Sequence, residues 1–367
     1  MRVLEFSGEI GSHEGCGCGF KHDKSLKEVV FAPLREALDH LGQLDLHPPY
    51  AVFYDDVTYR IAGRTVQKVL GARGVRVASP TFREAEEKAQ MLGAVKTVIA
   101  VGGGTVIDVA KYAAYVSGAD FVSIPTAPSH DGIVSPIASL FAEGRRVSIL
   151  TRAPATALID VSLLSSAPHE LITSGFGDIL AKTVSIKDWQ LGRDEASEAY
   201  CKSAESFTLR AINAVIDALK GGHDFTERVE LLATALINSG VAMMIVRSSR
   251  PASGSEHLIS HYLDMKLDRR LRHGIQCGIA ALVMAILHEK WNPNWWEDEA
   301  YRSDGLREYL SKAGVPLRLD EAGISGELMA EAISEAWRIR PDRYTILHKH
   351  RPSREEAFEL LRESGLI

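Results

Sequence analysis

The stretch VIAVGGGTVIDVAK, residues 98–111, joins an apolar strand pattern to a helical pattern through three consecutive glycines. Gly102, Gly103 and Gly104 lack the Cβ atoms that would keep the backbone away from a pyrophosphate group. The N–H groups that open the following helix then face the anion, and the helix dipole favours it. The stretch therefore predicts a dinucleotide-binding turn, although it is not the GxGxxG fingerprint and follows the third strand. A tight turn without a ligand is the alternative interpretation.

The sequence around this turn alternates apolar runs with helical patterns through the first 160 residues. Strands are expected at 50–54, 75–79, 96–104 and 121–125, the last of which closes the series, with helical patterns between them. This spacing indicates right-handed crossovers and a parallel sheet. After Asp160 the chain follows a helical period with few β-branched runs. We therefore expect an α/β, Rossmann-like domain over 1–160, an all-helical domain over 161–367, and a ligand cleft between them.

The composition is that of an ordinary globular protein, with 46% hydrophobic and 25% charged residues among 367. A net charge of -6 gives no reason to expect nucleic acid as a partner, because phosphate binding requires a basic face. No apolar run approaches the ~18–20 residues of a membrane span, and the first residues lack the apolar region of a signal peptide. Four cysteines are too few for a disulfide framework. A soluble, cytoplasmic enzyme is expected.

Two further features indicate functional residues. Asp55 follows the strand pattern AVFY, where a carboxylate can hydrogen-bond the adenosine ribose hydroxyls and repel a 2′-phosphate. That favours NAD over NADP, although Asp55 or Asp56 acting as a helix N-cap explains the pattern equally well. The proline-broken stretch SIPTAPSHDGIVSP, 123–136, leaves an apolar strand where α/β enzymes place functional residues, and a plain loop is the alternative.

Metal donors occur in three stretches of the helical half. SGFGDILAK contains Asp178, SGSEHLISH contains His257 and His261, and LRHGIQCG contains His273. Asp and His side chains that converge from separate elements are typical ligands of zinc, nickel or iron. A polar residue within an apolar helical segment is costly without a partner, so a metal site is a reasonable hypothesis. The spacing alone does not choose between His257 and His261.

The ordered set GGGTVIDVAK, PTAPSHDG, GFGDILAK, SRPASGSEHLISHYLDM and RHGIQCG resembles the sn-glycerol-1-phosphate dehydrogenases. They form part of the glycerol dehydrogenase, iron-containing alcohol dehydrogenase and dehydroquinate synthase superfamily. The bacterial AraM-like branch is the most similar, on the stretches RIAG, SIKDWQLGR and RYTILHKH. The resemblance implies a dehydroquinate synthase-like fold and reversible reduction of dihydroxyacetone phosphate to sn-glycerol 1-phosphate. It also implies NAD(H) or NADP(H), one divalent metal (zinc, nickel or iron), and a homo-oligomer.

The resemblance also assigns residues. The metal ligands that it implies are Asp178, His257 and His273. The substrate contacts that it implies are Asp131, Asp178 and His261. The nucleotide contacts that it implies are Gly102, Gly103, Gly104, Thr105, Val106, Thr126, Ala127, Pro128, Ser129 and Ser135. Three protein ligands leave a coordination position for the ketone oxygen, as a catalytic site requires. In this assignment His261, one helical turn beyond His257, hydrogen-bonds the substrate or relays a proton.

Lys182 lies four residues after Asp178, where iron-dependent relatives carry a histidine ligand. A protonated lysine cannot coordinate a metal, so Lys182 is expected to attract the substrate phosphate, with a solvated helix residue as the alternative. The residues that follow His273 and Gly274 are Ile275 and Gln276 rather than the charged or polar pair of many relatives, so the support of His273 is expected to differ.

The N-terminal stretch HEGCGCGFKH, 13–22, also offers metal donors, at His13, Cys16, Cys18 and His22. Its CxC spacing is not the usual CxxC knuckle, so free thiols, a glycine-rich lid or an edge hairpin are alternatives. Rival functions are a polyol or alcohol dehydrogenase of the same superfamily, a carbocycle-forming synthase that resembles dehydroquinate synthase, and a non-enzymatic sensor or scaffold. The stretch SRPASGSEH argues against the synthase, whose phosphonate clamp is rich in lysine and arginine.

Overall fold

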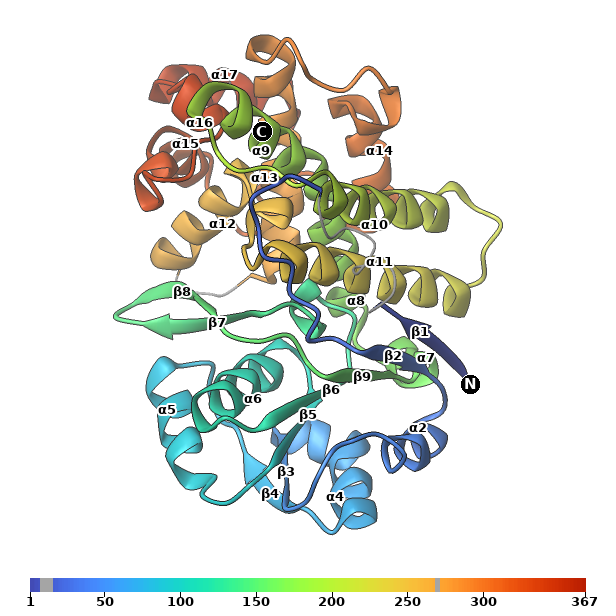
Figure 1. Ribbon diagram of the computed structural model, residues 1–367. Helices are drawn as coiled ribbons and strands as arrows, with labels where there is room; N and C mark the ends of the chain where they lie inside the picture. Colours follow the sequence, from blue (N-terminus) through green and yellow to red (C-terminus); the bar gives the residue numbers. More distant parts are fainter. Residues whose placement is uncertain (7–15, 268–270) are drawn as a thin grey trace.

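A computed structural model describes residues 1–6, 16–267 and 271–367. Figure 1 shows two halves, an α/β half formed by the first part of the chain and a helical half formed by the rest. The last strand ends at Ile159 and the next helix, α7, begins at Val161. The proposed division between residues 160 and 161 therefore falls between a strand and a helix.

The α/β half is built on a seven-stranded sheet with the order β1-β2-β9-β6-β5-β3-β4. Only the pairing of β1 with β2 is antiparallel among the described strands of this sheet. The strands are β1 (Arg2–Glu5), β2 (Glu28–Phe31), β3 (Tyr50–Tyr54), β4 (Arg73–Arg76), β5 (Thr97–Gly102), β6 (Asp120–Pro125) and β9 (Thr156–Ile159). The order reverses direction between β3 and β5, which is where open α/β sheets bind ligands.

Helices cover both faces of this sheet. Val98 and Ala100 of β5 belong to the same apolar core as α5 (Phe82–Met91) and α6 (Gly104–Ser117). Ile99 and Val101 belong to a second core with α2 (Leu34–Leu41) and α4 (Arg64–Leu70), while α3 (Asp56–Thr58) and the π-helix η1 (Tyr59–Gly63) lead into α4. Every residue of β5 is buried, as expected for a central parallel strand. The expected α/β architecture is confirmed.

The expected strand series was incomplete. It does not close at residue 125, because η2 (Asp131–Ile133) is followed by the hairpin of β7 (Ile137–Ala142) and β8 (Arg145–Leu150), and then by β9. The hairpin turns at Glu143 and Gly144, both at positive φ, and its strands are only partly buried. Strand β9 has four residues, too few to show a period, and its place between β2 and β6 depends on long-range pairing.

The helical half consists of α-helices with short 3₁₀ segments. They are α7 (Val161–Ser165), α8 (His169–Leu180), α9 (Lys182–Ala196), α10 (Lys202–Lys220), α11 (Phe225–Val246), η3 (Arg250–Ala252), α12 (Ser255–Lys266), α13 (His273–Trp291), η4 (Glu299–Tyr301), α14 (Ser303–Lys312), α15 (Gly326–Glu335), η5 (Ala336–Ile339), α16 (Ile346–Lys349) and α17 (Arg354–Glu363). By length and composition α11 alone among the described helices could cross a membrane. Within the fold 78% of its most apolar window is buried, which is typical of a core helix.

Candidate active site

Two adjoining cavities lie where the halves meet. A groove of about 550 Å³ runs along the glycine turn, and a smaller cavity of about 90 Å³ is lined in part by His257, His261 and His273. Residues that line both are Asp108, His130, Ser139, Arg146 and His273. The hairpin β7–β8 supplies Ser139 and Arg146 and reaches α12 of the helical half (Figure 1). A ligand in the groove can therefore extend into the cavity.

Most of the expected nucleotide contacts line the groove. They are Asp55, Gly103, Gly104, Thr105, Thr126, Ala127 and Ser129. Gly102, Val106 and Pro128 are not among the lining residues, and Ser135 lines the smaller cavity instead. Gly102 has a packing role, because a Cβ there would lie 2.6 Å from the Val106 side chain. A Cβ on Gly103 would meet no described atom within 4 Å, so this glycine leaves space on the groove.

Asp55 acts as a helix N-cap. Its Oδ1 accepts hydrogen bonds from the N–H groups of Val57 at 2.9 Å and Thr58 at 2.8 Å, which forms a capping box at the start of α3. Asp56 is the first residue of that helix and forms an ion pair with Arg76. The capping interpretation therefore applies to Asp55 and not to Asp56. Because Asp55 also lines the groove, its carboxylate lies within the proposed nucleotide site as well.

Lys111, which the sequence analysis did not single out, joins the glycine-turn helix to the 126–136 loop. Its Nζ is buried and donates to the carbonyl oxygens of Gly132 and Ile137, each at 2.8 Å. Asp108 lies 3.5 Å from the same Nζ. Asp108 and Lys111 are three residues apart in TVIDVAK, a spacing that puts both on one face of a helix, so the sequence could have indicated this pair.

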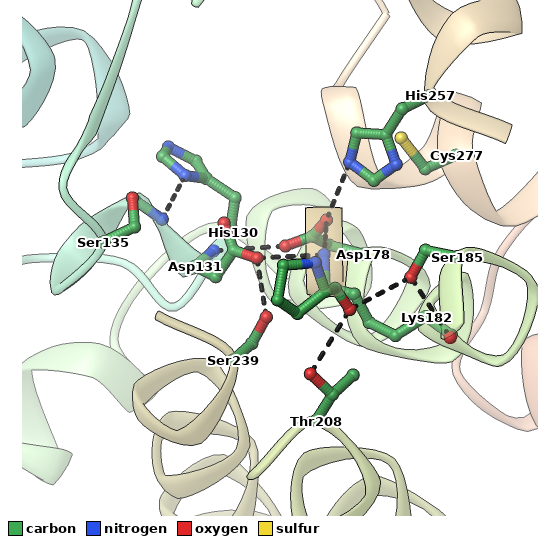
Figure 2. A network of polar contacts seen from close by, with 12 residues as sticks. His130, Asp131, Ser135, Asp178, Lys182, Ser185, Thr208, Ser239, His257 and Cys277 are labelled. Atoms are coloured by element: carbon green, nitrogen blue, oxygen red, sulfur yellow. Dashed lines mark hydrogen bonds and ion pairs between the residues drawn. The ribbon is translucent and has the colours of Figure 1, made fainter. Parts of the chain in front are cut away.

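The metal donors converge as expected. Ligand atoms of Asp178 on α8, His257 on α12 and His273 on α13 all lie within 4.8 Å of one another, together with Cys277, which sequence reasoning missed. In Figure 2, His257 lies over Asp178 with Cys277 beside it. The rings of His257 and His273 have their centroids 4.9 Å apart. Among the described residues this group includes His257 and not His261.

Glycines explain how α8 and α13 bring these donors together. A Cβ on Gly274 would lie 1.7 Å from the Ser174 carbonyl oxygen, and one on Gly177 would lie 2.3 Å from the Gly274 oxygen. The two helices can therefore approach backbone to backbone only with glycine at both positions. This approach places Asp178, which follows Gly177, beside His273, which precedes Gly274.

The two histidines of the metal-donor group, His257 and His273, each form a hydrogen bond through Nδ1 that orients the ring. His257 Nδ1 lies 2.6 Å from Glu256 Oε1, which also accepts the N–H of Gly254. Because a carboxylate only accepts, His257 Nδ1 carries the proton and Nε2 offers its lone pair, 3.8 Å from Asp178 Oδ1. A carboxylate behind a histidine is the usual support of a metal ligand.

The support of His273 passes through neutral groups. Ser260 Oγ lies 3.3 Å from His273 Nδ1 and donates to Gln276 Oε1 at 2.6 Å. Gln276 Nε2 in turn donates to Asp264 Oδ1 at 3.2 Å. Gln276, where many relatives carry a different residue, therefore takes part in the support of His273, because its amide links Ser260 to the Asp264 carboxylate.

Lys182 is buried between two carboxylates. Its Nζ lies 2.8 Å from Asp178 Oδ1 and 2.9 Å from Asp131 Oδ2 (Figure 2). Burial opposes the charged form, but attraction by both carboxylates outweighs it and raises the pKa of Lys182. Burial also acts to raise the pKa of Asp131, but Lys182 and a hydrogen bond from Ser239 lower it overall. The alternative of a solvated helix residue is wrong, because Lys182 is 0% exposed.

His261 and Asp131 line the smaller cavity. Burial lowers the pKa of His261 well below its ordinary value, and repulsion from the Arg146 guanidinium acts in the same direction. At neutral pH the ring is therefore uncharged and can both donate and accept a hydrogen bond. The two histidines of the HxxxH pair thus have different surroundings.

The comparisons with known proteins agree with this fold. Residues 32–168 match the family model of iron-containing alcohol dehydrogenases. A probable glycerol dehydrogenase from Sinorhizobium meliloti superposes with a TM-score of 0.73 at 19% identity, covering 92% of this chain and 97% of that one. Maleylacetate reductase from Agrobacterium tumefaciens gives a TM-score of 0.73 at 19% identity, covering 94% and 97% of the two chains. The fold is therefore that of the iron-containing alcohol dehydrogenases and the enzymes that share it.

Sequence relatives define the family within that class. An NAD(P)+ glycerol-1-phosphate dehydrogenase from Pyrococcus furiosus is 37% identical over 352 residues, covering 93% of this chain and 98% of that protein. One from Metallosphaera sedula is 37% identical over 342 residues, covering 91% and 94%. The chain belongs to the glycerol-1-phosphate dehydrogenase family of NAD(P)-linked, metal-dependent oxidoreductases. The expected fold class and family are confirmed.

Proposed function

We propose that this protein interconverts dihydroxyacetone phosphate and sn-glycerol 1-phosphate, with hydride transfer between NAD(P) and C2 of the substrate. The observation that carries the proposal is the convergence of Asp178, His257 and His273 beside a cavity that opens into the nucleotide groove. This arrangement would let a bound metal ion, the nicotinamide and a small substrate meet at one place. The fold alone does not select this substrate, because dehydrogenases that act on other substrates share it.

The donor set fits one divalent metal. A carboxylate and two imidazoles whose Nδ1 atoms are occupied match the preferences of zinc, nickel or iron, and Cys277 lies within reach as a softer neighbour. When bound, such an ion polarises the C2 carbonyl and stabilises the developing alkoxide. Asp178, His257 and His273 would hold it. The ion pairs of Lys182 with Asp131 and Asp178 offset part of the negative charge of these two carboxylates.

The nucleotide is assigned to the larger groove. The N–H groups that open α6 after Gly103 are available to an anion in this groove, which Thr126, Ala127 and Ser129 also line. We favour NAD(H), because the carboxylate of Asp55 disfavours a 2′-phosphate, and NADP(H) remains an alternative substrate. His130 lines both this groove and the smaller cavity.

The substrate phosphate is assigned to the arginine side of the smaller cavity. Arg146 lines this cavity, and its guanidinium is aligned by Asp264 at 2.7 Å and by Ser139 at 3.1 Å. A neighbouring pocket contains Arg340 beside Arg146 and His261. Lys182 does not line this cavity and is held by two carboxylates, so we assign the phosphate to Arg146 rather than to Lys182.

The remaining chemistry falls to His261 and Asp131. In the reduction direction the neutral imidazole of His261 can donate the proton of one ring nitrogen to the substrate oxygen while its other ring nitrogen takes a proton from solvent, and oxidation reverses both transfers. Asp131, kept ionised by Lys182, can accept a hydrogen bond from a substrate hydroxyl. Both residues thereby orient the substrate with C2 toward the nicotinamide.

A kinetic comparison of phosphorylated and free ketones tests the proposal. Wild-type enzyme is expected to prefer dihydroxyacetone phosphate over dihydroxyacetone, and Arg146→Ala to lower kcat/KM for the phosphorylated ketone by about 10- to 100-fold. The matched control is Arg83→Ala, which removes an exposed arginine of α5 that pairs with Glu87. Equal activity of the wild type on both ketones would instead indicate a polyol dehydrogenase.

A further inference from the structure

A second group of metal donors lies away from the active site, at the junction between the N-terminal segment and α10. It contains Cys16, Cys18 and His22 from the segment and Cys201 from the helical half. His22 and Cys201 are 179 positions apart in the chain. His13, the fourth donor considered from the sequence, lies outside the described residues. The fold therefore adds a donor that the sequence pattern did not include.

The distances within this group match a tetrahedral site. His22 Nε2 lies 3.5 Å from Cys16 Sγ, 3.2 Å from Cys18 Sγ and 3.6 Å from Cys201 Sγ. All four ligand atoms lie within 4.8 Å of one another. Zinc bonds to sulfur and nitrogen at tetrahedral angles put neighbouring S and N ligands about 3.6 Å apart and neighbouring S ligands about 3.8 Å apart. One imidazole nitrogen close to three separate sulfur atoms is thus the arrangement that a central ion would produce.

The four side chains are suited to a structural zinc site. All of the cysteines in the group are free thiols, so no disulfide uses their sulfur atoms. Cys201 is buried at the N-terminus of α10, a helix of 19 residues; burial raises the pKa of its thiol, the backbone N–H groups of Ala204 and Ser203 act to lower it, and a bound zinc ion would deprotonate it. Cys16 is exposed and Cys18 half-buried, which leaves a route for an ion from solvent.

We propose that Cys16, Cys18, His22 and Cys201 bind one zinc ion as a closed, four-coordinate structural site. Three thiols lose their protons to solvent on binding, and the imidazole binds through the lone pair of Nε2. A set with three thiolates is softer than the Asp178, His257 and His273 set of the active site, so the two sites differ in metal preference. No position is left for a substrate oxygen, which distinguishes this site from a catalytic one.

Such an ion would join the N-terminal segment to the helical half. Asp23, next to His22, already contacts the end of α11. Its N–H donates to the Ile245 carbonyl oxygen at 3.3 Å, and its carboxylate lies 3.5 Å from the Arg247 guanidinium. The loop before Cys201 carries Glu198, which holds Arg250 at 2.6 Å. Arg250 begins η3, which leads into α12 and its ligand His257. The zinc site therefore fixes a loop whose other contacts support the active-site helix.

Metal content separates this site from the active site. After expression with zinc and removal of loosely bound ions, we expect two equivalents of zinc per chain by plasma mass spectrometry. The double variant His257→Ala/His273→Ala should retain one equivalent, and Cys18→Ala should lose one. The matched control is Lys21→Ala, which removes an exposed side chain of the same segment and should retain both.

Cobalt identifies the ligands of the retained ion. In the His257→Ala/His273→Ala background, cobalt should give intense thiolate-to-metal charge-transfer absorption, and adding Cys18→Ala or Cys16→Ala should abolish it. These two side chains are not fully buried, so their truncation leaves the fold intact, as circular dichroism would verify. The proposal is overturned if the double variant contains no zinc, if its cobalt spectrum lacks thiolate bands, or if mass spectrometry of the unreduced protein finds these cysteines in a disulfide.

Discussion

Glu256 fixes the orientation of His257, because its Oε1 lies 2.6 Å from the imidazole Nδ1 and also accepts the N–H of Gly254 at 2.9 Å. Glu256 is 0% exposed. A fully buried carboxylate is costly unless its hydrogen bonds offset the lost hydration, so the burial of Glu256 beside a histidine indicates a positioning role.

Glu256→Gln should weaken metal binding at the active site by about 10- to 100-fold, because the amide can no longer hold the Nδ1 proton as a charged acceptor does. The measurement is competition with a chromophoric chelator, together with activity as a function of added metal. Excess metal should restore part of kcat. Glu355→Gln, an exposed position on α17, is the control. Unchanged metal affinity in Glu256→Gln would contradict the role of Glu256 in positioning His257.

The two histidines of the HxxxH pair should respond differently to truncation. His257→Ala and His273→Ala should lose the active-site metal, because each removes a donor of the cluster. His261→Ala should keep that metal and lose most of its turnover, because the ring lines the substrate cavity. Metal analysis beside steady-state kinetics distinguishes the cases. Loss of the active-site metal from His261→Ala would contradict the division of roles.

Lys182→Met should strongly destabilise the fold, because it leaves the buried carboxylates of Asp131 and Asp178 without their shared cation. Breaking a buried ion pair on one side costs about 3–5 kcal/mol. Urea unfolding of the metal-free protein measures the loss. Lys312→Met, which removes one partner of an exposed pair with Glu308 on α14, should cost less than about 1 kcal/mol. Similar losses in both variants would argue against the buried network.

Gly103→Ala should impair nucleotide binding without affecting the fold. The added Cβ meets no described atom within 4 Å, and the residue has an ordinary φ of −85°, so the melting temperature should stay within about 1 °C of the wild type. In the complex the same Cβ would obstruct the pyrophosphate, so KM for NADH should rise at least about 10-fold. Gly42→Ala, in the loop after α2, serves as the control. An unchanged KM would place the nucleotide elsewhere.

The sequence predicted the central strands because their apolar runs are continuous and clearly bounded. Strand β3 covers 50–54 as expected. Strand β5 covers 97–102 of the expected 96–104 and ends at the first glycine of the turn, and the strand expected at 75–79 is found earlier, at Arg73–Arg76. The strands β1, β2 and β9 were missed because each has four residues and gains its place from pairing with distant segments. Such short runs carry no distinguishing period. The β7–β8 hairpin was missed as well, although each of its strands has six residues.

The site was predictable in its residue types and not in its contacts. Apolar helices interrupted by Asp178, His257 and His273 indicated donors, and the family resemblance chose among them. The burial of Lys182 and the approach of Cys201 to His22 depend on how helices pack, which no local pattern contains. Glu256, directly before His257, was visible in the sequence as a carboxylate beside a histidine, and it was overlooked.

Analysis of the product of the purified, metal-loaded enzyme tests the central claim most directly. Incubated with dihydroxyacetone phosphate and NADH, the protein is expected to consume both in equal amounts and to form sn-glycerol 1-phosphate, identified by an enantiomer-specific assay. His261→Ala, assayed at the same metal content, should form little product. Formation of sn-glycerol 3-phosphate, or equal turnover of unphosphorylated dihydroxyacetone, would contradict the proposed function.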